Sequence, residues 1–261
     1  MRSSQSTPAI VLRARPYGES DRIVSFLTED FGKLTGIAKG ASRSRRRFVN
    51  SLEPFSLVSL RFQDRAHTNL AFIAGADLLF GFRQLASSLE RISYASYLVE
   101  ITDGLISERE ENLAVFQHLR DGLRYLEEIG SSLRFLTYYE LKLLRLAGYR
   151  PALDVCKRCG QARNQAQLGQ WHFSPADGGV LCGSCARLRR EVLPLGHLAA
   201  DMLSTLQTDD SNDLGNRVLL PASVIREMRA VLLRFIQYQM DREIKSAAFL
   251  NQFSALENPL A

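Results

Sequence analysis

Four cysteines, arranged as two Cys-x-x-Cys pairs, are the feature that most constrains how this chain folds. Cys156 and Cys159 form the first pair, and Cys182 and Cys185 form the second. Each pair can present two thiolates to one ion, so two pairs complete a closed tetrahedral shell that suits Zn²⁺. Because a catalytic zinc normally keeps an open position, the spacing predicts one structural zinc ion.

The residues around the cysteines suit a zinc ribbon, which we place at residues 151–189. Gly160 and Gly183 supply backbone freedom at the two turns, residues 171–174 can form a strand, and residues 178–179 can form a turn. A redox site is the weaker alternative, because such a pair normally stands alone and no βαβ pattern precedes either pair. Four independent buried thiols would not share this spacing by chance.

The N-terminal segment bears on where the chain works. Residues 1–8 are polar and rich in serine, without the apolar stretch of a secretion signal, so we expect a short flexible tail. No run of eighteen apolar residues occurs, and no membrane span is expected. A cytoplasmic location follows, where reducing conditions make disulfides among the four cysteines unexpected.

Positive charge is concentrated at the start of the chain. Residues 1–50 hold ten basic and four acidic side chains, whereas the other 211 residues hold 23 basic and 24 acidic ones. Such a region attracts polyanions through counterion release and long-range steering. We therefore expect nucleic acid to bind within the first fifth of the sequence.

One run of residues carries most of this charge. It holds five cations within nine residues and no acid, and we call it the basic loop: Lys39, Arg43, Arg45, Arg46 and Arg47. An exposed loop of this kind can contact phosphates, and Phe31 or Phe48 could stack on bases. We place Arg22 and Lys33 on the same surface, because they occupy strand ends or a polar strand face. A solvated loop and a nuclear-localisation signal are the alternatives.

The first eighty residues have the pattern of a small β-domain. Alternating or β-branched runs predict five strands, at residues 9–15, 22–28, 33–39, 56–62 and 70–76. Five short strands with tight turns suit a barrel of the OB type. A five-stranded sandwich or an SH3-like barrel would show the same spacing, so these alternatives stay open.

A helical period begins near residue 81. It predicts five helices, at residues 92–105, 113–126, 133–147, 195–206 and 223–240, and no clear pattern after residue 251. The chain is therefore predicted to be a multi-domain α+β protein with a helical bundle that contains the cysteine module as an insertion. Its expected parts are an OB-fold DNA-binding domain at 1–80, a helical domain at 81–150 and 190–250, and the Cys₄ zinc-binding module.

Enzyme signatures are absent from the sequence. We find no phosphate-binding loop, dinucleotide-binding glycine motif, nucleophile elbow or metalloprotease motif. A binding protein that is not an enzyme is the expectation. An RNA-binding OB and zinc-ribbon protein and a metal-dependent nuclease are the two alternatives.

Several blocks of sequence resemble one known family over most of residues 8–190. They lie at residues 9–24, with Arg15-Pro16-Tyr17-Gly18-Glu19-Ser20-Asp21 inside, and at 28–33, 36–41, 135–144, 148–153 and 156–160. These blocks resemble the RecO family of bacterial recombination mediators. Residues 246–250 depart from the more basic pattern expected there.

The resemblance implies a set of properties that the residue patterns do not supply. It implies binding of single- and double-stranded DNA, annealing of complementary strands, and help in loading RecA onto strands covered by single-strand-binding protein (SSB). RecR and the acidic C-terminal tail of SSB are the implied partners, with RecA engaged indirectly. The RecFOR pathway and a nucleoid-associated place in the bacterial cytoplasm are implied as well.

Overall fold

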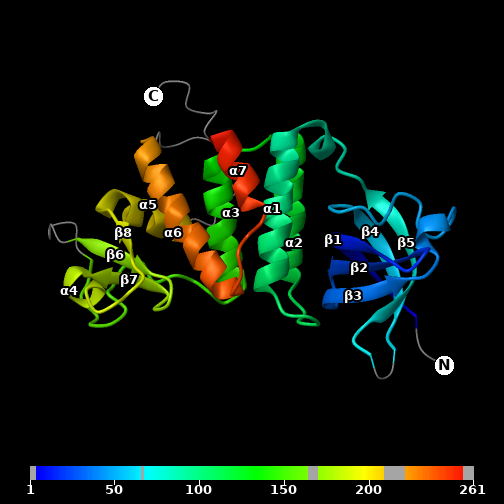
Figure 1. The fold of residues 1–261 in the computed structure, drawn as a ribbon, viewed down its shortest axis with the longest axis horizontal. Coiled ribbons are helices and arrows are strands. Elements are labelled where there is room, and N and C mark those ends of the chain that lie inside the picture. The colour runs from blue at the N-terminus through cyan, green and yellow to red at the C-terminus, as the bar shows by residue number, and fades with distance from the viewer. Residues whose placement is uncertain (1–3, 66–67, 164–169, 209–220, 255–261) are drawn as a thin grey trace. The chain divides into compact units, whose positions relative to one another are not determined.

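The computed structural model describes residues 4–65, 68–163, 170–208 and 221–254, with side chains as far as residue 250. The chain forms two compact units, residues 1–130 with 246–261 and residues 131–245 (Figure 1). None of the described helices is both long enough and apolar enough to cross a membrane.

The N-terminal part of the first unit is a closed five-stranded barrel. Its strands are β1 (Gln5–Tyr17), β2 (Asp21–Thr28), β3 (Gly32–Ala38), β4 (Leu57–Gln63) and β5 (Ala71–Phe80). They close in the order β1-β2-β3-β5-β4, with β3 and β5 parallel and the other neighbours antiparallel. Closure rules out a sandwich and this order is that of an OB-type barrel, so the predicted fold is confirmed.

The barrel begins earlier in the chain than the sequence indicates. Residues 5–8, expected in a flexible tail, form the start of β1 and pair with β4, which closes the barrel. Thr7 is buried, and its hydroxyl donates to Asp30 at 2.7 Å. The expectation for residues 5–8 was wrong because the pairing strand lies far along the sequence.

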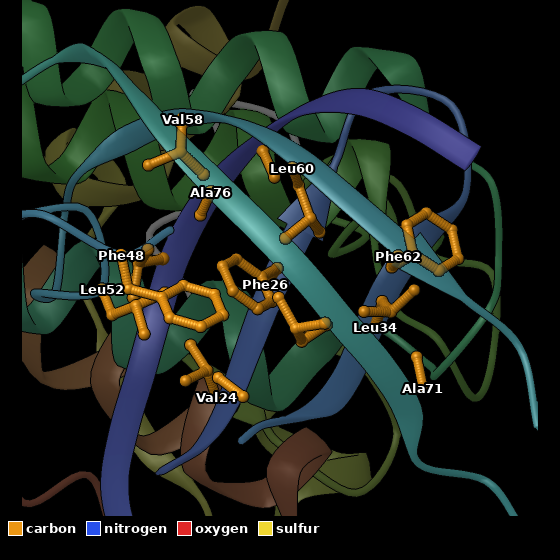
Figure 2. Packing of buried hydrophobic residues seen from close by; sticks show 14 of the residues in the cluster. Val24, Phe26, Leu34, Phe48, Leu52, Val58, Leu60, Phe62, Ala71 and Ala76 are labelled. Carbon is orange, nitrogen blue, oxygen red and sulfur yellow. The ribbon is translucent and has the colours of Figure 1, made fainter. Parts of the chain in front are cut away.

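The barrel core takes side chains from the strands and from the connection between β3 and β4. Inward positions such as Phe26 and Leu60 alternate along the strands, as a half-buried strand requires (Figure 2). Phe48 and Leu52 come from the connection and lie in the same cluster (Figure 2). This connection, which contains the 3₁₀ helix η1 (Ala41–Arg43), is therefore anchored in the core.

The outer face of β2 and β3 is covered. Val24 and Phe26 belong to the core, so the alternating residues Ile23 and Leu27 face outward, and yet both are buried. In the same phase on β3, Lys33 donates to the backbone carbonyl of Asp103 at 2.7 Å. Asp103 lies in helix α1 (Leu89–Leu105), so α1 lies against this face of the barrel.

Helix α1 is the centre of the first unit's helical part. Buried residues such as Tyr94, Tyr97 and Ile101 lie on several sides of it, as expected for a helix that is covered all round. It contacts the short helix η2 (Leu85–Ser87), helix α2 (Leu113–Glu128) and helix α7 (Ala247–Ser254).

Helix α7 lies beside α1 in Figure 1 and was not predicted. The backbone N–H and the hydroxyl of Ser246 both donate to the carboxylate of Glu100, at 2.8 and 2.6 Å, where α7 begins. Residues 251–254 are helical, so the expectation of no pattern there was wrong. The rest of that segment, 255–261, lies outside the described residues.

The second unit consists of helices around a small sheet. Its elements are α3 (Leu133–Leu146), β6 (Trp171–Ser174), β7 (Gly179–Cys182), α4 (Gly183–Ala186), β8 (Leu193–Leu195), α5 (His197–Thr208) and α6 (Ala222–Met240). The three helices α3, α5 and α6 contact one another, and the sheet has the order β7-β6-β8. The helices are confirmed within a few residues, whereas β8 was missed because three residues carry no readable period.

We predict that Gly32→Ala destabilises the protein more than Gly18→Ala does. Both glycines have left-handed backbone, at φ 63° and 62°, so alanine strains both sites by about 1–2 kcal/mol. A Cβ at Gly18 would meet nothing, whereas one at Gly32 would collide with the backbone carbonyl of Glu110 in the loop after α1. We expect an additional loss of about 1–3 kcal/mol at Gly32, measured by urea denaturation. If both variants lost the same free energy of unfolding, the loop after α1 would not be in close contact with Gly32.

Candidate metal centre and nucleic-acid interface

The first cysteine pair lies in a tight turn of the second unit. The N–H of Cys156 donates to the carbonyl of Gln161 at 2.8 Å, and the N–H of Gly160 donates back to the carbonyl of Cys156 at 2.9 Å. Gly160 has φ 73°, a left-handed conformation that glycine adopts without a steric penalty. The turn therefore places Cys156 and Cys159 on the same side.

The second pair joins a strand to a short helix. Cys182 is the last residue of β7, and Cys185 lies in α4 directly after it. The N–H of Lys157 donates to the carbonyl of Val180 at 2.9 Å, and the N–H of Cys182 donates to the Cys156 sulfur at 3.4 Å. These bonds hold the two turns face to face.

The four sulfur atoms form a cluster of the size that a tetrahedral metal site needs. All lie within 4.8 Å of one another, and the Cys159 and Cys182 sulfurs are 3.8 Å apart. Metal–sulfur bonds of about 2.3 Å give a tetrahedron with edges of about 3.8 Å, whereas a disulfide requires about 2.05 Å. No other described His, Asp or Glu joins the cluster. The four predicted ligands therefore could hold one metal ion in a closed shell.

The pKa values of the cysteine thiols also favour a bound cation in the cluster. Burial raises the pKa of Cys156, but the backbone N–H groups of Cys159, Cys182 and Arg158 outweigh it and lower that pKa to about 6. The contact with the Cys182 sulfur raises the pKa of Cys185 to about 12. One thiolate thus discourages further ionisation beside it, and a bound cation would remove that repulsion.

The cysteine module is fastened to α5 and α6. Arg163 donates to Asp201 of α5 at 2.6 Å, and Ser204 of α5 donates to Asp154 at 2.8 Å. Phe173 of β6 packs edge-on against Phe235 of α6, with ring centroids 5.3 Å apart. These contacts join the cysteine module to both helices.

The basic loop lies on the first unit and is held at both ends. Phe48 is only 6% exposed, in the barrel core, and the N–H of Ala76 donates to the carbonyl of Arg47 at 3.0 Å. The Arg47 guanidinium donates to the carbonyl of Lys39 at 2.8 Å and lies over the Phe48 ring. Arg47 therefore stabilises the conformation of the loop and also contributes to its positive charge.

The other cations of the loop face solvent. Lys39, Arg43, Arg45 and Arg46 are all exposed. Arg43 lies 3.9 Å from Glu19, a contact between two exposed side chains that contributes little. No described residue pairs with Arg45 or Arg46. These two guanidinium groups are the most available to a polyanion.

The two remaining predicted DNA-binding residues differ in position. Arg22 is the second residue of β2, close to the loop, and donates to Glu53 at 2.9 Å. Lys33 lies on the covered face of the barrel, where its ammonium is 3.4 Å from the Asp103 carboxylate and its side chain is 12% exposed. Lys33 serves the contact between barrel and helix, and we leave it out of the proposed interface.

Neither aromatic residue expected to stack on bases is free to do so. Phe48 belongs to the barrel core, and Phe31 packs edge-on against Phe62 with centroids 5.3 Å apart. Arg15 and Tyr17, which sequence reasoning did not single out, are exposed at the end of β1. The alternation of Arg13, Arg15 and Tyr17 along one strand was a signal that could have found them.

The fold and the two sites define a class of protein: an OB-type barrel with a basic end, a helical second unit, and a four-cysteine module able to hold a metal ion. Comparison with known proteins identifies the family of this chain. Residues 1–82 match the family description "Recombination protein O N terminal", and residues 86–248 match "Recombination protein O C terminal". The chain belongs to the RecO family.

Several relatives share nearly the full length of the chain. The "DNA repair protein RecO" of Syntrophus aciditrophicus is 35% identical over 257 residues, which cover 98% of both chains. The protein with the same description from Anaeromyxobacter dehalogenans strain 2CP-C is 35% identical over 95% of this chain and 96% of its own. That of Bacillus pumilus is 32% identical over 95% and 94%.

Replacing Cys182 and Cys185 with serine is expected to abolish metal binding. The wild-type protein should contain one metal ion per chain by elemental analysis, and the double variant should contain essentially none, with a lower Tm because the turns lose their common ligand. Ser184→Ala, between the two cysteines, is the matched control and should keep the metal. A stoichiometry of one in the double variant would contradict the four-cysteine site.

Proposed function

We propose that this protein is a DNA-binding recombination mediator in DNA repair that works without catalysis. The observation that carries the proposal is the basic loop, whose exposed Arg45 and Arg46 stand on a backbone anchored in the barrel core. Membership of the RecO family favours DNA over the RNA alternative.

The chemistry of the loop supports strand annealing. Guanidinium groups bind phosphates without reading base sequence, so the surface accepts either single- or double-stranded DNA. Cations between two strands reduce the repulsion of their phosphates, which lowers the barrier to pairing without any need for ATP. The described part of the basic loop contains no acidic residue that would oppose this.

The metal in the cysteine cluster is proposed to be one zinc ion. Four thiolates in a tetrahedral arrangement are a donor set that suits Zn²⁺, and a shell closed by Cys156, Cys159, Cys182 and Cys185 leaves no position for a substrate. The ion would supply structural cross-linking alone. Because the module is fastened to α5 and α6, it would act as a brace for the helices.

The partners of the protein follow from the family and are proposals here. We propose that it displaces or remodels SSB through the acidic C-terminal tail of SSB, that it works with RecR, and that RecA benefits indirectly by being loaded onto the freed strand. Residues 1–80 would bind DNA, residues 81–150 and 190–250 would form the helical domain, and residues 151–189 would bind zinc. The site of action would be the nucleoid in the cytoplasm.

The double variant Arg45→Ala/Arg46→Ala is expected to bind DNA more weakly and with less salt dependence. Each phosphate of a single strand that a cation no longer neutralises lowers the slope of log K against log salt by about 0.7, so the slope should fall by about 1.4. Fluorescence anisotropy over a salt series measures this. Arg83→Ala/Arg124→Ala, which removes two exposed arginines from the same unit, should leave the slope unchanged.

Annealing of complementary strands gives the second readout of the same variants. The loop variant should anneal both bare and SSB-coated strands slowly, whereas the control should match the wild type. Deleting the SSB tail should impair annealing of coated strands only. Wild-type affinity, slope and annealing in the loop variant would refute the proposed interface, and strand cleavage with a divalent metal would refute the non-catalytic assignment.

A further inference from the structure

The far end of the β1–β2 hairpin extends beyond the neighbouring strand. Strand β4 pairs with β1 only between Gln5 and Ile10, whereas β2 pairs with β1 as far as Tyr17 opposite Asp21. We call residues 15–22 the hairpin tip. The β1 side of this tip is paired with β2 alone, and its residues Arg15, Pro16 and Tyr17 are exposed.

Two side chains of the hairpin tip share one face. After the bulge at Val11 and Arg13, Arg15 pairs with Ile23 and Tyr17 pairs with Asp21. Residues two apart on a strand project to the same side, so Arg15 and Tyr17 lie in one row. A cation and an aromatic ring are thus adjacent on an exposed strand.

Tyr17 is unusually accessible for an aromatic side chain. It is 53% exposed, although burial of such a ring would be favourable. Among the described aromatic residues of the barrel, Phe80 is the other one with large exposure, and it packs edge-on against Phe82 at 4.8 Å. More than half of the Tyr17 side chain therefore stays available to a ligand.

The hairpin tip and the basic loop are joined by hydrogen bonds. The N–H of Ser42 donates to the carbonyl of Ser20 at 2.9 Å, and the N–H of Gly40 donates to the carboxylate of Asp21 at 2.8 Å. The tip therefore has a fixed position beside the loop. Phosphates on the loop and a base on Tyr17 could belong to the same strand of DNA.

The barrel face on which OB folds commonly bind oligonucleotides is covered in this protein. OB barrels commonly bind oligonucleotides over strands 2 and 3, but here the outer face of these strands carries the buried Ile23 and Leu27 and the contact between Lys33 and Asp103. Phe48 lies in the barrel core, and the partly buried Phe31 packs against it and against Phe62. Among the described aromatic side chains of the barrel, Tyr17 at the hairpin tip is the most exposed.

We propose that Tyr17, supported by Arg15, stacks on an unpaired base and makes the DNA-binding surface prefer single strands. The inference rests on the proposed function, because the basic loop must first hold the phosphates. Stacking requires a base whose face is free, which a single strand offers and an intact duplex does not. The loop thus supplies affinity for any DNA, and Tyr17 distinguishes the two forms.

The test compares Tyr17→Leu and Tyr17→Phe on a mixed-sequence oligonucleotide and on its duplex. Loss of one stacked base is worth about 1–3 kcal/mol, so Tyr17→Leu should weaken single-strand binding roughly 5- to 150-fold. Its duplex affinity should change less than about twofold, and Tyr17→Phe should restore single-strand binding because the ring is kept. Quenching of 2-aminopurine in the oligonucleotide, present with Tyr or Phe and lost with Leu, reports the stacking itself.

The controls separate this inference from the proposed function. Phe80→Leu removes another exposed barrel aromatic and should bind both DNA forms normally. An equal loss on single strand and duplex, or wild-type behaviour of Tyr17→Leu, would overturn the role of Tyr17 while leaving the basic loop intact. Failure of the wild-type protein to bind either DNA would instead overturn the proposed function. Circular dichroism confirms that each variant is folded.

Discussion

The contact of Lys33 with Asp103 decides which surfaces of the barrel stay open. The Lys33 ammonium donates to the Asp103 backbone carbonyl at 2.7 Å and faces its carboxylate, with both side chains largely buried. The Arg13 guanidinium also lies 3.9 Å from the Asp103 carboxylate, so β1 and β3 both contact the helix through this residue. Thr35 adds a second bond, to Glu108 at 2.9 Å. That face is committed to α1 and the loop after it, whereas the basic loop and the hairpin tip lie together at an exposed end of the barrel.

The second unit lacks a barrel and consists of helices around a small sheet that carries the cysteine module. Its sheet has only three short strands, and the cysteine module is bonded to α5 and brings together four sulfurs that could hold a metal ion. Its contacts to the helices, such as that of Arg163 with Asp201, mean that a metal ion bound there would stabilise more than the module itself. The basic loop and the cysteine module lie in different units, and we propose a separate task for each: DNA binding for the first and bracing of helices for the second.

Features set by neighbouring residues were predictable from the sequence. Burial that depends on residues far away in the sequence was not. The period of two predicted the five strands, and the cysteine spacing predicted the cluster, because each pair is confined to one short turn. Lys33 has the sequence pattern of an exposed strand cation, and only Asp103, 70 positions later, reveals that it is covered. Phe48 follows a run of arginines as a loop residue would, yet its ring completes the barrel core. Helix α7 was missed because its start depends on Glu100, 146 positions earlier.

The central claim is that DNA binds the end of the barrel and not the outer face of β2 and β3. Photocross-linking of a single strand that carries bromodeoxyuridine, followed by peptide mass spectrometry, tests it most directly. The account predicts cross-links within residues 15–22 and 39–47. Cross-links concentrated within residues 23–37, with residues 15–22 and 39–47 unmodified, would contradict it.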